Sequence, residues 1–495
     1  MKRKYYLGIF SGITLWGIYS ILVMLRTKSI ISEFGSEINA INQSAQQIFN
    51  YFILFESGMG QAYLFKMFEP MADKNYNKIA SLYAGLSISM GKIAVKMSLA
   101  ILPVAGIYAA IMNRQNVEYF SACFIIILLG IRFVIPYFFS VSRKTLLILY
   151  DYKYYVDIVD SIGNIVTVLI ELFLMWKTDV SIVFILCIGC IVNALLGEVY
   201  EISIRRLCRN SVNIQAVPGF EAEQLTKDII LHQVSGLLNS NIDTLLLSIV
   251  NIQLVTIYQA YNLICTYPVQ LINKISELFR ARFGIRLANN DEYIYRDFQR
   301  LLSFHMLMAV IAVATFITDI NPFIGLWIGE EFVIEMTGVY LFAVYMIQRM
   351  TINVIYIIRD GKGLYKESKM FSIKEAVMNL ILSILLVKRF EIAGVMMATV
   401  IAVYLGLVPG NTKIVFKQIF NKKNYIYIDY LVMILTIGVS VIFYRLFMKG
   451  YIINSWGRLI VSAGVQVIVA GIFGGIILCI YKLKYLRNEG VNKLT

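Results

Sequence analysis

Residues 181–197 read SIVFILCIGCIVNALLG and contain no charged side chain. A run of this length and polarity is typical of a helix that crosses the hydrocarbon core of a bilayer. Cys187 and Cys190 have the C-x-x-C spacing of some redox sites, but inside such a run we interpret them as small buried hydrophobic residues. Similar apolar runs of roughly 20 residues recur along the chain between polar breaks.

The composition agrees with this pattern. Of the 495 residues 59% are hydrophobic and 15% are charged, whereas a soluble domain is about half apolar and about a quarter charged. The net charge of +14 could indicate a nucleic-acid partner, but lysines and arginines also collect in the cytoplasmic loops of membrane proteins. The sequence therefore predicts a polytopic membrane protein in contact with lipid, with no nucleic-acid partner.

The apolar runs give about 14 candidate transmembrane helices. They begin near residues 7, 38, 93, 120, 154, 181, 229, 253, 301, 337, 371, 391, 426 and 457. Barrel alternation is missing, so we expect an all-α fold, because only helices and closed barrels satisfy the backbone in lipid. Most basic residues fall in the even-numbered breaks and the two tails, which predicts an N-in, C-in topology; Lys388 and Arg389 are exceptions.

A weak internal repeat suggests two pseudo-symmetric halves. A shift of 216 residues (257 minus 41) places INQSAQQIFNY (41–51) on IYQAYNLICTY (257–267). Many transporters are built from such duplicated halves. We expect an N-terminal six-helix bundle, a cytoplasmic linker, a C-terminal six-helix bundle, and a terminal helix pair with a cytoplasmic tail. These segments are 1–210, 211–228, 229–420 and 421–495.

Four ionisable residues lie deep in predicted spans: Glu56, Arg132, Asp243 and Arg349. Such groups are costly in lipid and normally face a cavity or a partner. In one interpretation they neutralise each other as buried pairs. In the other, the arginines face a water-filled cavity and bind a phosphate in bidentate fashion. For Glu56 and Asp243 we expect a structural or ion-coupling role, because a carboxylate repels a phosphate.

Four further charged residues lie nearer the predicted membrane surface. Lys374 and Glu375 lie about one turn into the eleventh span, where they could snorkel to the interface or take part in coupling. Lys92 and Lys96 lie one helical turn apart at the start of the third span, after a polar segment that reads as a cytoplasmic extension of that helix. We expect this pair to form a basic entrance at the inner leaflet.

Signatures of catalysis are missing from the sequence. It contains neither a G-x-x-x-x-G-K-[ST] phosphate loop nor an H-E-x-x-H metal motif, and its two histidines, His232 and His305, are far apart. A nucleophile with a base is not visible either. We therefore expect a protein that is not an enzyme and that uses no metal or cofactor.

The stretch LRTKSIISEFGSEINAINQSAQQIFNYFILFESGMGQAYLFKMFEP (25–70) resembles bacterial polysaccharide repeat-unit flippases. These are the Wzx-type transporters of the multidrug/oligosaccharidyl-lipid/polysaccharide (MOP) superfamily. The matching positions are Arg26, Gly35, Glu37, Glu56, Gly58 and Pro70, whereas Phe68 replaces an expected tyrosine. The blocks NSNIDTLLLSIV, NPFIGLWIGEEF and RDGKGLYKESKMFSIKEAVMNLILSILLVKRFEIAGVMMATV extend the resemblance to about residue 425.

The resemblance implies a flippase of the bacterial cytoplasmic membrane. Such a protein moves an undecaprenyl-diphosphate-linked oligosaccharide from the inner to the outer leaflet by alternating access. It serves capsule or O-antigen synthesis, beside a polysaccharide polymerase and other assembly proteins. The implied substrate-binding candidates are Arg26, Arg132 and Arg349, with Glu56, Asp243, Lys374 and Glu375 as cavity or coupling residues. Arg132 is not part of the family pattern and rests on its burial alone.

The sequence leaves the driving force and two alternative functions open. The driving force could be a H+ or Na+ gradient, the membrane potential or removal of the substrate outside. A cation-coupled multidrug exporter of the same superfamily is a second candidate, which the intramembrane arginines disfavour. A membrane-bound repeat-unit polymerase or ligase is a third, but it would need a large folded outer loop that the predicted topology lacks.

Overall fold

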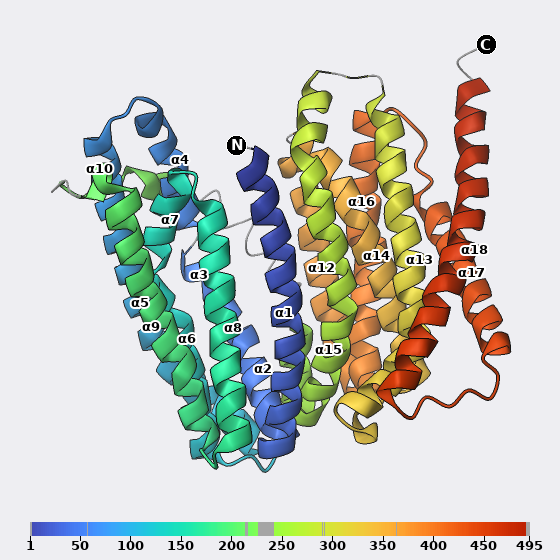
Figure 1. Ribbon diagram of the computed structural model, residues 1–495, viewed down its shortest axis with the longest axis horizontal. Helices are drawn as coiled ribbons and strands as arrows, with labels where there is room; N and C mark the ends of the chain where they lie inside the picture. The colour runs from blue at the N-terminus through green and yellow to red at the C-terminus, as the bar shows by residue number, and fades with distance from the viewer. Residues whose placement is uncertain are drawn as a thin grey trace. The chain divides into compact units, whose positions relative to one another are not determined.

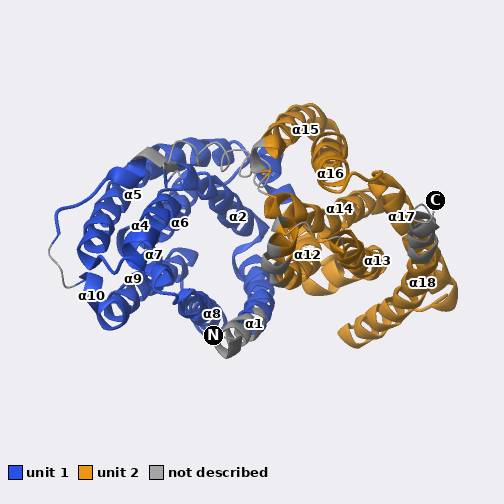
Figure 2. Ribbon diagram, turned by 90° about the horizontal axis from the view of Figure 1, so that it is seen from above, with its two compact units in different colours: residues 1–256 blue, residues 257–495 orange. Residues whose placement is uncertain are grey.

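The computed structural model describes residues 2–56, 58–212, 216–225, 242–289, 291, 293–362 and 364–491. Every regular element in these ranges is a helix (Figure 1), as expected where the backbone must satisfy its own hydrogen bonds in lipid. The chain divides into two compact units, residues 1–256 and 257–495 (Figure 2). The all-helical membrane class is confirmed, whereas the finer division at residues 210, 228 and 420 stays a prediction.

Nine helices in the described ranges are long and apolar enough to cross a membrane. The predicted spans near 371 and 391 lie within one element, α15 (Tyr365–Ala402), which bends where Glu391 leaves helical geometry. Most of the predicted span near 229 falls outside the described residues, and its end is the helical stretch 242–250. The total of 14 spans and the N-in, C-in orientation stay predictions.

The first unit contains the elements that build the site described below. They are α1 (Lys2–Phe34), α2 (Ser36–Asn50), α3 (Ile53–Glu56), α4 (Met59–Ala72), α5 (Tyr76–Asn113), α6 (Tyr119–Phe139), α7 (Val141–Leu149), α8 (Lys153–Lys177), α9 (Ile182–Leu207), α10 (Arg209–Val212) and the short 3-10 helix η1 (Glu221–Leu225).

The second predicted span is a broken helix. α3 ends at Glu56 and α4 begins at Met59, with Gly58 in the left-handed region at φ 69°. A residue with a Cβ pays a steric penalty in that region, so glycine suits this position. α4 then continues to Ala72, and α5 starts at Tyr76. The polar segment before Lys92 is therefore helical and continuous with the third span, as predicted, whereas its cytoplasmic location stays a prediction.

Helices α1 and α8 pack together through a cluster of buried apolar side chains. Ile30 of α1 meets Val168, Leu172 and Met175 of α8, and Ile185 of α9 completes the cluster. Trp176 adds a hydrogen bond from its indole nitrogen to the hydroxyl of Ser29, at 2.8 Å. These contacts fix the register between the two helices, so polar residues of α1 and α8 that face each other are held in an apolar surrounding.

Residues 216–225, which we call the docked segment, lie along α5. The Ser81 hydroxyl donates to the carbonyl of Val217 at 2.6 Å, and the amide of Gly219 donates to the carbonyl of Ser81 at 2.9 Å. The approach is close enough that a Cβ at Gly85 would lie 1.9 Å from the carbonyl oxygen of Gly219. The described part of the predicted linker is thus bound to the first unit rather than free of it.

The second unit is also all-helical in its described part. Its elements are α12 (Ile252–Ala288), which crosses the boundary, α13 (Ile294–Trp327), the 3-10 helix η2 (Glu330–Phe332), α14 (Met336–Gly361), α15, the π-helix η3 (Val403–Leu407), α16 (Val408–Lys413), the π-helix η4 (Ile414–Ile419), α17 (Ile426–Phe447) and α18 (Trp456–Val491).

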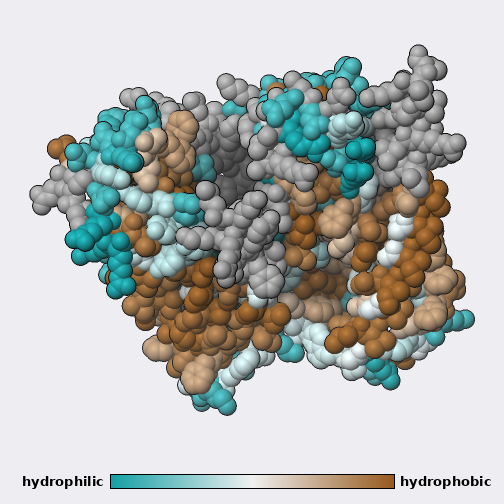
Figure 3. Space-filling view, turned by 45° about the horizontal axis from the view of Figure 1, so that its top comes forward, coloured by the Kyte–Doolittle hydropathy of each residue, from teal (hydrophilic) through white to brown (hydrophobic). Residues whose placement is uncertain are grey.

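Exposed apolar side chains form a belt on each unit. In the first unit Leu99, Ile107 and Phe173 are exposed, and in the second Leu435 and Ile460. Figure 3 shows the belt as brown surface bordered by hydrophilic residues. Apolar patches of this extent are rare on soluble monomers, and the belt is the surface that lipid would cover.

Candidate functional site

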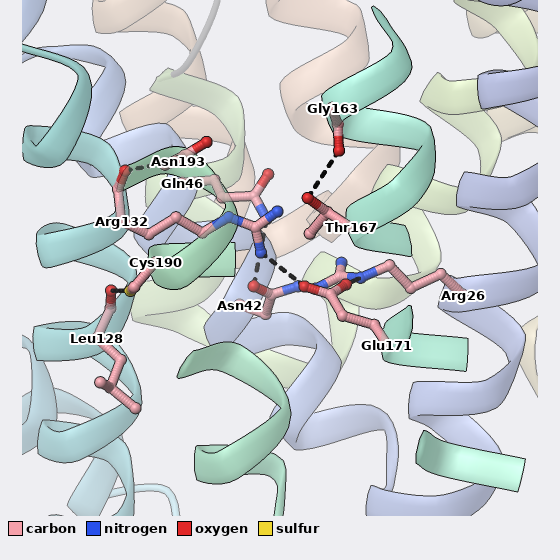
Figure 4. A network of polar contacts seen from close by, with 10 residues as sticks. All are labelled: Arg26, Asn42, Gln46, Leu128, Arg132, Gly163, Thr167, Glu171, Cys190 and Asn193. Atoms are coloured by element: carbon pink, nitrogen blue, oxygen red, sulfur yellow. Dashed lines mark hydrogen bonds and ion pairs between the residues drawn. The ribbon is translucent and has the colours of Figure 1, made fainter. Parts of the chain in front are cut away.

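Glu171 lies at the centre of a buried ionic group in the first unit (Figure 4). It belongs to α8, within the apolar stretch IVTVLIELFLMW (165–176), and its side chain has no solvent exposure. One carboxylate oxygen, Oε2, accepts from Nε of Arg26, and the other, Oε1, accepts from Nη1 of Arg132 at 2.9 Å. Two of the predicted arginines are thus brought together by a carboxylate. We call these three residues the Arg–Glu–Arg group.

Arg26 comes from α1, one turn before the apolar contact that Ile30 makes with α8. Its side chain is 11% exposed, against 26% for that of Arg132. Apart from the contacts with Glu171, no hydrogen bond to either guanidinium occurs among the described residues. A guanidinium carries five N–H donors, so most donors of both arginines remain available to a further acceptor.

Arg132 comes from α6 and lies over a glycine of α9. A Cβ at Gly189 would be 2.4 Å from the guanidinium carbon Cζ of Arg132. The absence of a side chain at this position therefore makes room for the arginine. One turn further along α9, the amide of Asn193 donates to the backbone carbonyl of Arg132 at 3.0 Å. Residues of α9 thus fix both the backbone and the side chain of Arg132.

Two polar side chains of α2, Asn42 and Gln46, appear in the same close view and bond to each other (Figure 4). The amide of Gln46 donates to Oδ1 of Asn42 at 3.2 Å. The Nδ2 group of Asn42 is buried and has no hydrogen-bond partner among the described residues. It adds a neutral donor beside two cationic ones.

The charges of the Arg–Glu–Arg group do not cancel. Two guanidiniums share one carboxylate, which leaves one net positive charge, since arginine stays protonated in proteins. An uncompensated charge inside a membrane-spanning bundle is costly. An anion that accepts hydrogen bonds from the guanidiniums would offset that cost, and phosphate oxygens suit their planar donor geometry.

Glu56 lies at the break of the second span and makes no hydrogen bond or ion pair with the Arg–Glu–Arg group. Its carboxylate accepts from the hydroxyl of Tyr137 at 3.5 Å and lies 3.1 Å from where a Cβ at Gly60 would be. The carboxylate therefore faces the first turn of α4, where the helix dipole favours a negative charge. Asp243 is buried in the stretch 242–250 and interacts electrostatically with Tyr51.

In the second unit, Arg349 of α14 lies beside aromatic and acidic groups. Its guanidinium carbon is 5.3 Å from the ring centroid of Tyr345, and it interacts electrostatically with Tyr356 and Glu375. Glu375 of α15 is buried. Its neighbour Lys374 is exposed and directs its Nζ to the carbonyl of Leu405 at 3.5 Å. The structure therefore separates the two adjacent charges of α15.

Lys92 and Lys96 are both exposed on α5. Nζ of Lys92 lies 5.3 Å from the ring centroid of Phe220, which belongs to the docked segment. That geometry is a cation–π contact. One of the two predicted entrance lysines thus also holds the docked segment, while Lys96 makes no hydrogen bond or ion pair with the described residues.

Sequence reasoning missed Glu171 and Gly189. An acid inside the apolar run 165–176 was a visible signal for Glu171, because ionisable residues in such runs are costly. Gly189 gave no signal of its own, since its role depends on the packing of α6 against α9. Within the described residues, no group of three or more His, Cys, Asp or Glu could hold a metal ion.

Comparisons with known proteins place the fold. No protein-family model matches the sequence, and no curated protein matches it. Solved structures do match. The lipid II flippase MurJ in its inward closed conformation has a TM-score of 0.71 and 13% identity, covering 94% of this chain and 98% of that one.

The chain shares its fold with MurJ and with MATE transporters. The MATE multidrug transporter DinF-BH gives a TM-score of 0.59 at 13% identity, covering 84% of this chain and 95% of that one. An inward-facing MATE transporter of the MOP superfamily gives 0.58 at 13% identity, with 81% and 96% covered. These structural neighbours are transporters rather than enzymes. Sequence identities this low establish a shared fold but not a shared function.

Proposed function

We propose that this protein is a flippase for an anionic lipid-linked oligosaccharide. Its substrate would be an undecaprenyl-diphosphate-linked repeat unit, moved from the inner to the outer leaflet of the bacterial cytoplasmic membrane. The likeness to MurJ, a lipid II flippase, supports a lipid-linked substrate. The resemblance of residues 1–425 to Wzx-type flippases supports an oligosaccharide head group and assembly proteins such as a polymerase as partners.

The observation that carries the proposal is the net positive charge of the Arg–Glu–Arg group. Glu171 is fully buried and satisfies one N–H of each arginine. The remaining donors of Arg132, the more exposed arginine, are available to a diphosphate oxygen. Hydrogen bonds to charged groups contribute about 1.5–3 kcal/mol each, so a diphosphate held by both arginines would be bound specifically.

Release of the head group requires that the bound state is not too stable. Glu171 holds one N–H of each guanidinium whether or not a phosphate binds the remaining donors. When the substrate leaves, each arginine therefore keeps the carboxylate as a partner. The pairing thus lowers the free energy of the substrate-free state. A more stable substrate-free state favours release of the substrate and so turnover.

A second candidate is a cation-coupled multidrug exporter, which the likeness to MATE transporters favours. The two candidates make opposite demands on charge. A cationic drug would be repelled by the Arg–Glu–Arg group and would need acidic contacts such as Glu56, whereas a diphosphate needs the arginines. A translocation assay with both substrates can therefore separate them.

The test uses proteoliposomes that contain an undecaprenyl-diphosphate oligosaccharide with a fluorescent sugar, whose outward exposure is read with an impermeant quencher. We expect Arg132→Gln and Arg26→Gln each to slow translocation at least tenfold, the effect of about 1.4 kcal/mol. The control is Arg205→Gln, which removes an exposed arginine paired with Glu201 on the same helix.

Two results would contradict the proposal. In one, both arginine variants move the lipid at the wild-type rate. In the other, the wild-type protein moves a cationic dye but not the lipid-linked oligosaccharide, which would favour the exporter. A loss of transport in Arg205→Gln equal to that in Arg132→Gln would also remove the special role of the Arg–Glu–Arg group.

A further inference from the structure

A second buried acid lies in the other unit, far along the sequence from the Arg–Glu–Arg group. Asp319 of α13 is 5% exposed. Its Oδ1 accepts from the hydroxyl of Ser462 on α18, and its Oδ2 lies 3.1 Å from the hydroxyl of Thr318. Ser462 in turn is 2.5 Å from the hydroxyl of Tyr444 on α17. A chain of hydroxyls thus connects three helices to one carboxylate.

Asp319 makes no ion pair with any described residue. Neither of the nearby arginines forms an ion pair with Asp319. Arg445 on α17 is exposed, and Arg458 on α18 donates to the carbonyl of Ile452 at 3.1 Å. An ionised carboxylate buried without an opposite charge is strongly destabilising. Hydrogen bonds from neutral hydroxyls lower this cost but supply no charge, so a cation is needed to neutralise the group.

A further polar side chain faces the same interface. Gln466 follows Ser462 by one turn on α18, is fully buried, and neither its Oε1 nor its Nε2 has a hydrogen-bond partner among the described residues. α18 runs antiparallel to α13, because Ser462 contacts Asp319 while Gly474 approaches Leu307 and Val310. Gln466 lies between these two contact points on the buried stripe of α18 and so faces α13, one helical turn along from the contact with Asp319.

We propose that Asp319, Ser462 and Gln466 form a binding site for a monovalent cation, H+ or Na+, between α13 and α18. The site offers a carboxylate, a hydroxyl and an amide oxygen, and Thr318 adds a second hydroxyl. Oxygen donors of this kind are the ligands that hard cations prefer. A proton would neutralise the same carboxylate by direct attachment. The site is separate from the Arg–Glu–Arg group and depends on no particular transported substrate.

Other titratable groups on the neighbouring elements must be separated from Asp319 in any pH measurement. They include Tyr340 and Tyr345 on α14, Glu330 and Glu331 on η2, Asp429, Tyr444 and Arg445 on α17, Tyr451 between α17 and α18, and Arg458 on α18. The variant Asp319→Asn separates them, because it removes the proposed ligand and leaves all of these groups in place.

The test follows tryptophan fluorescence and thermal unfolding of the purified full chain. Trp456 begins α18 and packs edge-on against Phe323, with ring centroids 5.6 Å apart, so its emission reports on this end of the helix pair. One arm titrates NaCl against choline chloride at pH 8. The other lowers the pH from 8 to 5 without Na+. At a hundredfold excess over its Kd, a bound ion raises the melting temperature by about 3–5 °C.

We expect the wild-type protein to respond in at least one arm and Asp319→Asn to respond in neither. A Na+ response identifies Na+, and a response to acid alone identifies H+. Asp429→Asn, which removes another buried carboxylate of the same unit, on α17, should keep the wild-type response. The proposal is overturned if the wild type responds in neither arm, or if Asp319→Asn responds as the wild type does.

A second variant decides the question if Asp319→Asn does not fold. Gln466→Leu removes a buried amide whose polar atoms lack partners, so we expect it to fold with unchanged or higher intrinsic stability. The proposal requires that it also weakens the response about tenfold. An unchanged response in Gln466→Leu together with an unchanged response in Ser462→Ala would contradict the site.

Discussion

Glu171 accepts hydrogen bonds from Arg26 and Arg132 while being fully buried, so both arginines depend on it. We expect Glu171→Gln to lower the free energy of unfolding by about 3 kcal/mol, because removing one partner leaves buried charges uncompensated. The same variant raises the net charge of the group from +1 to +2 and should bind pyrophosphate at least as well as the wild type. Thermal unfolding and pyrophosphate titration on one preparation measure both effects. An unchanged stability would show that the pairing contributes nothing.

Gly189 provides the space that the Arg132 guanidinium occupies. We expect Gly189→Ala to displace the guanidinium from Glu171 and to weaken pyrophosphate binding about tenfold, the effect of losing one charge-assisted hydrogen bond. Gly91→Ala on α5 is the matched control, since a Cβ there has open space. Equal affinities for the two variants would mean that Arg132 does not need its observed position.

At the residue level, the sequence predicted the charges but not their pairing. Arg132 was predicted from its position in an apolar run, and Arg26 from the family pattern. Glu171 lay in an equally apolar run and was overlooked. That one carboxylate joins both arginines depends on the packing of α1, α6 and α8 in space, and a single sequence contains no record of those contacts.

The docked segment, residues 216–225, is held against α5 by polar contacts and close backbone packing. Its contacts with α5 include the ion pair of Lys78 with Glu221 at 2.5 Å and the hydrogen bond from Ser89 to Glu223 at 2.6 Å. A side chain at Gly85 would clash with the backbone of Gly219. We expect Gly85→Leu to release the segment and to raise its cleavage by a glutamate-specific protease severalfold. Gly91→Leu should leave cleavage unchanged, and equal rates for the two would contradict the docking.

The connection between α12 and α13 should make the second unit sensitive to acid. Arg286 donates to Asp291 at 2.7 Å and lowers the pKa of that carboxyl below its usual value of 3.8. A lowered pKa contributes stability above that usual value, and the contribution is lost as the pH falls through the lowered pKa.

We therefore expect Asp291→Asn to lower the melting temperature slightly at pH 7, and the difference from the wild type to shrink as the pH falls below 3.8. Glu367→Gln, an exposed residue of α15, is the control. A difference that does not shrink as the pH falls would argue against the ion pair with Arg286.

Helices were predictable from hydropathy, but the break at Gly58 was not. It lies inside a run that reads as one ordinary span, whereas the bend at Glu391 falls where one predicted span ends and the next begins. The break at Gly58 is a backbone conformation of a single residue, which an average over a span cannot detect. The break puts the carboxylate of Glu56 at the start of α4, inside the predicted membrane region.

For the whole molecule, the amount and distribution of apolar residues predicted the membrane class, and ordered motifs predicted the superfamily fold that MurJ and the MATE transporters share. Neither kind of evidence identifies the substrate, since the same fold carries lipids in one case and drugs in others. We propose that the net charge of the Arg–Glu–Arg group selects the substrate, and that charge can be changed one residue at a time.

Affinity for pyrophosphate across a charge series is the most direct test of this account. The series comprises the wild type (+1), Arg132→Gln (0), Glu171→Gln (+2) and the double variant (+1), measured by calorimetry on the purified protein at constant ionic strength. We predict the weakest binding in Arg132→Gln, at least tenfold below the wild type, and a partial recovery in the double variant. Affinities that do not follow the net charge of the group would contradict the claim that it binds an anionic substrate.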